Sequence, residues 1–326
     1  MRPLRRRNGL LSTSSGLRLA LGMEVSLARR PGRAAASMTT DPNRRQRFGT
    51  RLAAGPLLWL IVFLVGPLAI LIAWSFQAPS NTLRFESSSL GGYSSILGVS
   101  SYWELLAWTI FTAVVVGVLS VIFAFPIAYL LAFVADRHRF LLFGLAFVPF
   151  LTSYVLRIFA WRLILGENGL LNQTLMSLGI IDTPLTALLY SRLTVIIVLT
   201  YVWIPWAALP IFVRLDSLPR PLLEAAADLG VSPMRTVARV VLPIALPGIY
   251  TAFFLVFIPT LGDFATAAYV GGTNGIMIGN LIQGFLNNLD LPSGSVLTVV
   301  LLAVAAILML LAVRIMRIKS VTDVQL

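Results

Sequence analysis

The sequence has no cysteine, one histidine and one lysine, and these absences exclude several kinds of chemistry. Without cysteine there is no disulfide framework and no thiolate metal site. His138 stands alone in a basic turn, so a two-histidine zinc site is impossible, and we expect no metal. Lys319 follows Ile318 instead of a glycine, so the phosphate-binding Gly-Lys-Ser/Thr sequence is missing. We therefore expect no catalysis and no cofactor in this chain.

Charge is also scarce. Charged residues make up 12% of the chain, whereas soluble globular domains contain about 25%. Hydrophobic residues make up 58%, and the mean hydropathy is +0.88. This composition excludes a disordered chain and argues against a soluble enzyme. It indicates a polytopic membrane protein.

Six stretches are long and apolar enough to cross a membrane, which takes about 20 residues. They lie at residues 53–76, 105–135, 140–165, 193–215, 244–268 and 295–316. The sequence thus predicts an all-α integral membrane protein with about six transmembrane helices. The first stretch could instead be a cleaved signal peptide, but it is longer than the usual core of about 7–15 residues. We favour an uncleaved first span.

The arginines follow a topology pattern. Residues 1–52 hold 12 of the 25 basic residues and no sustained apolar run, so we predict a disordered cytoplasmic tail there. Met23 and Met38 are alternative starts to Met1, and part of the first 37 residues would then be untranslated or without function. With this end inside, 21 basic residues are cytoplasmic and two lie outside. This asymmetry predicts that both termini, including a tail at 319–326, are cytoplasmic, and it accounts for the charge without nucleic acid.

The predicted transmembrane body at residues 53–318 contains one informative loop, at 216–243. Prolines near its start suit the first turn of a helix, and Gly230 suits a left-handed helix end. Ser232 could then cap a second short helix that begins at Pro233. The sequence therefore predicts two short helices with a glycine corner at the cytoplasmic surface.

The first of these helices carries a possible docking face. Glu224 and Asp228 lie one turn apart and offer carboxylates to a partner. Small and aliphatic residues recur at helical spacing as one apolar stripe, namely Leu218, Leu222, Ala225 or Ala226, and Leu229. The stripe has nothing of its own to bury against. This favours docking of another protein over a plain connecting loop.

The loop resembles the "EAA loop" of permeases in binding-protein-dependent ABC importers. The matching residues are Glu224-Ala225-Ala226, Gly230, Val240 and Leu242-Pro243, with valine where isoleucine is usual in the family. The resemblance implies a type I ABC importer permease architecture. It also implies that the loop docks into a cleft of a cytoplasmic ATPase subunit, and that closure of the ATPases switches the permeases between inward and outward opening.

The resemblance extends over about residues 55–318 and is nearest to spermidine/putrescine transport system permeases. Short matching motifs include Pro149-Phe150-Leu151-Thr152-Ser153, Asn168-Gly169-Leu170-Leu171-Asn172 and Leu261-Gly262-Asp263-Phe264. It implies translocation of a polyamine, delivered by an extracytoplasmic binding protein, across a bacterial inner membrane. The expected partners are two ATPase subunits, which hold ATP and magnesium, and a second, different permease chain. Close relatives carry other solutes, so a different cargo stays open.

Three residues are candidates for the solute path. Asp263 is the only carboxylate well inside a predicted span, where a charge usually faces a cavity or a partner. It could neutralise a polycation, or it could pair with Arg157 or with the second permease. Trp203 and Trp206 could attract a cation through their rings, worth about 0.5–2 kcal/mol each, or could simply pack. Arg157 would repel a polycation, so we predict a gating or structural role for it.

Two other classes of protein remain as alternatives. A secondary transporter working alone often shows similar halves, but residues 53–165 and 193–316 share no convincing similarity. A membrane enzyme would need a metal site, a catalytic triad or clustered carboxylates, and the sequence has none of these patterns. The importer permease is the interpretation that best fits the residues.

Overall fold

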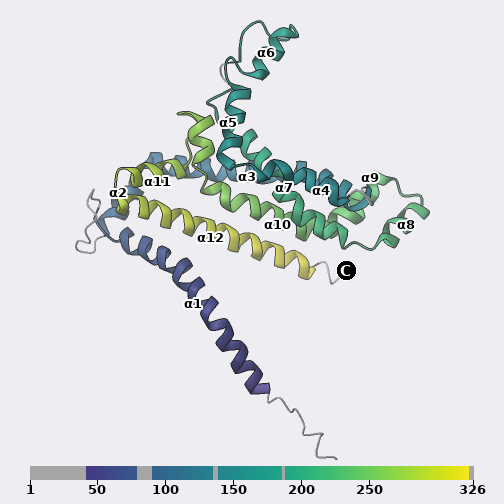
Figure 1. Cartoon of the computed structure of the whole chain (residues 1–326), viewed down its shortest axis with the longest axis horizontal. Coiled ribbons are helices and arrows are strands. Elements are labelled where there is room, and N and C mark those ends of the chain that lie inside the picture. The colour runs from purple at the N-terminus through teal and green to yellow at the C-terminus, as the bar shows by residue number, and fades with distance from the viewer. Residues whose placement is uncertain (1–41, 79–89, 135–138, 186–187, 323–326) are drawn as a thin grey trace, which may run out of the picture. The chain divides into compact units, whose positions relative to one another are not determined.

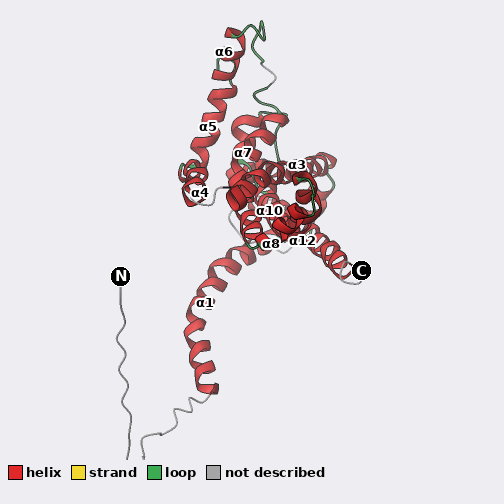
Figure 2. Ribbon diagram, turned by 90° about the vertical axis from the view of Figure 1, so that its right-hand side faces the viewer, coloured by secondary structure: helices red, strands yellow, loops and turns green. Residues whose placement is uncertain are grey.

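The structure is a computed structural model that describes residues 42–78, 90–134, 139–185 and 188–322. Within these ranges the chain is helical and contains no β-strand (Figures 1 and 2). The α-helices are α1 (Pro42–Ser75), α2 (Gly91–Leu97), α3 (Ser100–Tyr129), α4 (Arg139–Phe147), α5 (Tyr154–Leu165), α6 (Leu170–Ser177), α7 (Arg192–Asp216), α8 (Arg220–Asp228), α9 (Pro233–Thr236), α10 (Leu242–Leu261), α11 (Ile278–Asn287) and α12 (Leu291–Thr322). Shorter π-helical turns cover Leu130–Val134, Val237–Val241 and Ala267–Gly271.

The chain divides into two compact units, residues 1–59 and 60–326. The described part of the first unit is helix from Pro42, whereas the sequence predicts a disordered tail to residue 52. Proline suits the first helical position, where its missing N–H leaves no helical hydrogen bond unmade, so the helix can begin there. Residues 1–41 of the predicted tail, the alternative starts and His138 lie outside the described residues.

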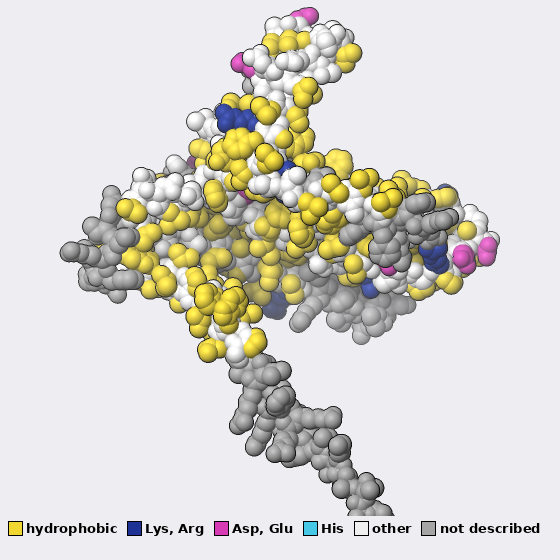
Figure 3. Space-filling view, in the orientation of Figure 1, with side chains coloured by type: hydrophobic (Ala, Val, Ile, Leu, Met, Phe, Trp, Pro, Cys, Tyr) yellow, Lys and Arg dark blue, Asp and Glu magenta, His cyan; other side chains and the backbone are white. Residues whose placement is uncertain are grey.

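Five helices of the described residues are long and apolar enough to cross a membrane. They are Gly55–Ser75, Ser100–Val134, Arg192–Asp216, Pro233–Leu261 and Leu291–Arg314. These correspond to five of the six predicted spans and confirm an all-α integral membrane fold. Large apolar side chains lie exposed along them, and Figure 3 shows hydrophobic atoms over much of the visible surface. Lipid tails can cover such a surface.

The predicted span at 140–165 is not one helix. Helix α4 gives way to a 3₁₀ turn at Val148–Leu151, and the chain is extended at Thr152 (ψ 152°) and Ser153 (ψ 138°) before α5 begins. Pro149 lies in the 3₁₀ turn and has no N–H to continue an α-helix. The two helices point in different directions (Figure 2).

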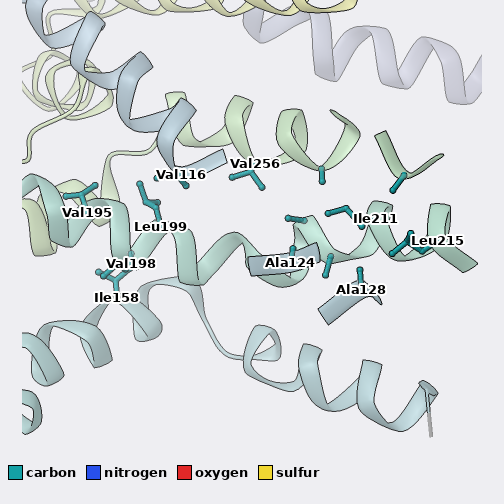
Figure 4. Packing of buried hydrophobic residues seen from close by; sticks show 14 of the residues in the cluster. Val116, Ala124, Ala128, Ile158, Val195, Val198, Leu199, Ile211, Leu215 and Val256 are labelled. Carbon is teal, nitrogen blue, oxygen red and sulfur yellow. The ribbon is translucent and has the colours of Figure 1, made fainter. Parts of the chain in front are cut away.

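Helices α3, α7 and α10 pack together as the centre of the second unit. Their shared core contains the labelled residues of Figure 4, which include Ile158 from α5. Many of the buried residues are small, including Ala124, Ala245 and Ala252, which lets the helix backbones approach closely. At Gly248 of α10 an added Cβ atom would lie 2.8 Å from the carbonyl oxygen of Pro210 in α7. A second core joins α2, α3, α10, α11 and α12.

Candidate functional site

Helix α8 ends at a left-handed glycine, as the sequence predicts. Gly230 has φ +71°, and its N–H donates to the carbonyl of Ala227 at 2.9 Å. The N–H of Val231 donates to the carbonyl of Ala226 at 3.0 Å. These two bonds form a Schellman motif, which satisfies the last carbonyls of the helix and reverses the chain. The corner is therefore built from local backbone bonds.

The second predicted short helix is instead the first turn of a long one. Helix α9, a π turn at Val237–Val241 and α10 run on as one helical span, Pro233–Leu261. The N–H of Leu242 bonds to the carbonyl of Val237, five residues back, immediately before Pro243. A wider π turn accommodates the proline, so Leu242 and Pro243 lie inside the helix. Ser232 is at the cap position, but its side chain makes no capping hydrogen bond.

The predicted apolar stripe of the loop divides between two environments. Leu218 and Ala226 are buried, and Leu223 packs against the central core. Leu222, Leu229 and Ala225 are exposed, with Leu229 82% exposed. Leu223 therefore joins the loop to the central core, and the outward residues are left exposed among the described residues.

We define the docking surface as Leu222, Glu224, Asp228, Leu229 and Met234. All five are exposed, and Met234 is 80% exposed. Figure 3 shows acidic and hydrophobic atoms at the end of the molecule where Figure 1 places α8. Exposed leucine and methionine beside carboxylates form an apolar patch with a charged rim, which is typical of a protein interface.

A polar cluster lies at the opposite end of α10. Helix α10 ends at Leu261 and Gly262, so Asp263 follows the helix instead of lying within it. The Asp263 carboxylate accepts the N–H of Thr266 at 3.0 Å and the hydroxyl of Thr266 at 3.3 Å. It also accepts the hydroxyl of Tyr154 from α5. Asp263 thus caps the next helical segment. Among the described residues its side-chain partners are Tyr154 and Thr266, and not Arg157, which was one of the alternatives.

Arg157 and Trp206 both contact one phenylalanine, Phe150. The Arg157 guanidinium carbon is 4.6 Å from the ring centre of Phe150. The ring of Trp206 meets that of Phe150 edge-on at 6.4 Å between centres, and Trp206 remains 42% exposed. The structure therefore places two predicted site residues around Phe150, which the sequence analysis did not single out.

Two of the predicted residues hold buried nitrogens without hydrogen-bond partners among the described residues. They are Arg157, at Nε and Nη1, and Trp203, at Nε1. Buried polar groups normally find a partner, so we expect water or another chain to supply one for these atoms. Trp203 also packs against the central core, as in the packing interpretation.

Sequence reasoning missed Tyr154 and Thr266. An aspartate after a glycine and three residues before a threonine at a helix start is a capping pattern, and it could have identified Thr266. Nothing local marks Tyr154, because it lies 109 positions from Asp263. Only the packing of α5 beside the residues after α10 brings them together.

A family model described as "Binding-protein-dependent transport system inner membrane component" matches residues 94–319. The chain belongs to this family. The match covers the docking surface and the polar cluster, and it confirms the family indicated by the EAA-like loop. As a member of this family, the protein is a multi-pass component of the bacterial inner membrane with a role in transport.

Named relatives match over most of their length. The spermidine/putrescine transport system permease protein PotB of Escherichia coli K12 is 33% identical over 254 residues, 77% of this chain and 92% of that protein. PotB of Haemophilus influenzae is 30% identical, over 77% of this chain and 87% of that protein. The E. coli inner membrane ABC transporter permease protein YdcU is 31% identical, over 77% and 85%.

Two solved structures share the fold. One is a crystal structure of a bacterial ABC transporter that imports the acidic polysaccharide alginate, with a TM-score of 0.65 and 17% identity over 84% of this chain and 96% of that one. The other is an alginate ABC transporter in complex with its pentasaccharide-bound periplasmic protein, with a TM-score of 0.66 and 14% identity over 82% and 93%. At these identities the match confirms the importer permease fold.

Proposed function

We propose that this chain is a permease subunit of an ATP-driven ABC importer that carries a polyamine such as spermidine or putrescine. The observation that carries the proposal is the docking surface on the Gly230 corner, combined with the identity to the PotB permeases. The protein provides a path for the solute, and it performs no chemistry of its own.

The partners follow from the shape and chemistry of the docking surface. An ATPase subunit receives the α8 corner, with apolar contacts to Leu229 and Met234 and polar contacts to Glu224 and Asp228. Two such ATPases, which hold ATP and magnesium, serve this chain and a second, different permease. An extracytoplasmic binding protein delivers the solute. The docking surface and both termini then face the cytoplasm, as the arginine distribution predicts.

The solute path runs past the polar cluster and the aromatic residues near it. A polyamine is a flexible polycation, and Asp263 is a carboxylate close to Tyr154, while Trp206 exposes part of its ring. Trp203 supplies a second ring on α7. Ammonium groups are attracted by both kinds of side chain. Arg157, beside Phe150, has a gating or structural role.

The test is uptake of labelled spermidine and putrescine in a strain that lacks this gene and other polyamine importers. We expect the wild-type gene to restore uptake and Gly230→Trp to abolish it at equal membrane levels. A Cβ atom added at Gly230 meets no atom within 4 Å, so the local cost of the substitution is the strain of its positive φ. It would block the docking surface or distort the corner.

Two matched variants separate these causes. Gly230→Asn keeps a residue that tolerates positive φ, and we expect most uptake to remain. Gly179→Trp places the same bulk at another exposed glycine with φ +69° and no atom within 4 Å, and we expect normal uptake. Normal uptake by Gly230→Trp would refute the docking role. Failure of the wild-type gene to restore polyamine uptake would refute the cargo.

A further inference from the structure

Helix α5 contacts the residues after α10 at two places along its length. The Tyr154 hydroxyl donates to Asp263 and lies 2.6 Å from the Thr266 hydroxyl. Further along both segments, the ring of Phe159 is 4.8 Å from that of Tyr269. We call the hydrogen-bonded group of Tyr154, Asp263 and Thr266 the latch. It holds α5 against residues 263–271.

Both latched segments start at a break in the helical backbone. The extended residues Thr152 and Ser153 precede α5, and Gly262 ends α10 just before Asp263. Residues at element ends are the ones that absorb backbone changes in hinge and sliding motions. Helix α5 can therefore shift along residues 263–271 without unwinding α7 or α10.

A second charged group competes for Asp263. The Arg157 guanidinium carbon is 5.9 Å from the ring centre of Tyr154, and Nε and Nη1 of Arg157 are buried with no hydrogen-bond partner among the described residues. A carboxylate bonds more strongly to a guanidinium than to a neutral hydroxyl. Arg157 and Asp263 thus both lie close to Tyr154. In this structure Asp263 accepts its hydrogen bond from the Tyr154 hydroxyl and not from Arg157.

Residues three apart on a helix lie on one face, about 4.5 Å apart along the axis. Tyr154 and Arg157 have this spacing, so a shift of α5 by about one turn would place Arg157 where Tyr154 now lies. We propose that Tyr154 and Arg157 are alternative partners of Asp263, which hold α5 in two positions of the transport cycle. This gating role rests on the proposed function, because ATP binding by the partner ATPases drives the shift.

Cysteine cross-linking tests the shift directly, because the natural chain has no cysteine. In the complex with its ATPases, Phe159→Cys with Tyr269→Cys should react with a short bifunctional thiol reagent when nucleotide is absent. With ATP and vanadate we expect the yield to fall several-fold. Arg162→Cys with Tyr269→Cys should show the reverse change, because residue 162 moves to the level of residue 159.

A control pair reports on access of the reagent alone. Phe147→Cys with Trp206→Cys joins α4 to α7, whose rings are 6.3 Å apart, and its yield should not depend on nucleotide. Equal yields with and without nucleotide for both test pairs would overturn the proposal. Neither test pair alters the latch itself, so the readout does not depend on a latch variant that folds poorly.

Tyr154→Phe tests the hydroxyl. We expect ATPase activity without solute to rise several-fold and the resting 159–269 cross-link to weaken. Arg157→Gln should instead weaken the ATP-bound 162–269 cross-link. Tyr201→Phe is the matched control, since its described contact is a ring contact with Trp161 that phenylalanine keeps. Unchanged cross-links in both latch variants would overturn the proposal.

The cross-links need no polyamine. Nucleotide-dependent cross-links without polyamine uptake would therefore refute the proposed cargo and support the latch. Polyamine uptake with nucleotide-independent cross-links would refute the latch and leave the proposed function standing.

Discussion

The two ends of the helix that contains α10 are built in opposite ways. Near its start, at Met234, and on the adjacent α8 corner, apolar side chains and carboxylates lie exposed. After its other end, the Asp263 carboxylate is enclosed by partners from the same chain. An exposed apolar surface needs another protein, whereas a satisfied polar cluster holds its own chain together.

Between these ends, α10 packs closely against α7. Ala245, Gly248 and Ala252 are buried, and the backbones of α10 and α7 approach closely at Gly248. Near the start of α10, the Arg214 side chain of α7 donates to the carbonyl of Ile244 at 3.0 Å. We expect a helix packed in this way to transmit a displacement at the docking surface to the polar cluster, because close-packed interiors deform little.

The largest expected effect comes from loosening that connection. Gly248→Leu places side-chain atoms within 2.8 Å of the Pro210 carbonyl and 3.3 Å of the Ile211 Cα atom. Overpacking of this kind costs about 1–3 kcal/mol. We expect a lower melting temperature of the purified protein and loss of uptake.

Gly144→Leu is the matched control, because no atom lies within 4 Å of its added Cβ atom. It should leave the melting temperature unchanged. A normal melting temperature for Gly248→Leu would mean that α7 and α10 separate readily. The helix could then not connect the docking surface to the polar cluster at Asp263.

A second effect, confined to binding of the ATPase subunit, is expected at the docking surface. Leu229→Asp changes an 82% exposed side chain, so the fold should not change. Burial of a leucine in an interface is worth about 1.5–3 kcal/mol. We therefore expect retention of the ATPase subunit in mild detergent to fall by about 10-fold or more.

Leu178→Asp, at an exposed leucine of the segment after α6, controls for general loss of apolar surface. It should retain the ATPase subunit. Equal retention by Leu229→Asp would place the docking contact elsewhere.

The smallest effect concerns the cap at Asp263. Loss of a capping side chain costs about 0.5–2 kcal/mol, and asparagine caps about as well as aspartate. Asp263→Ala should therefore lower the melting temperature by a few degrees, and Asp263→Asn by less. If both variants transport polyamine normally, Asp263 is a cap, lies outside the solute path, and is not the shared partner of Tyr154 and Arg157. If Asp263→Asn is stable but transports poorly, the negative charge itself matters.

The α8 corner was predictable because its bonds are local. The Ala226 to Val231 hydrogen bond spans five residues, and Gly230 is the residue type that such an end favours. The second helix was mispredicted because Pro243 is usually a helix stop, and a π turn before it cannot be recognised from apolar spacing. The break between α4 and α5 was also missed at a proline, Pro149. Proline occurs inside many continuous membrane spans, so its presence alone does not predict a break.

The sequence by itself determined the membrane class, the family and the docking corner, because hydropathy, arginine placement and local capping depend on neighbouring residues. Only the tertiary structure decided which residues surround Asp263. Tyr154 and Arg157 are far from it along the chain, and the packing of α5 beside residues 263–271 brings them to one place. Side-chain partners on different helices depend on how the helices pack. Hydrophobic periodicity predicts where a helix lies in the sequence, but not which other helix it packs against.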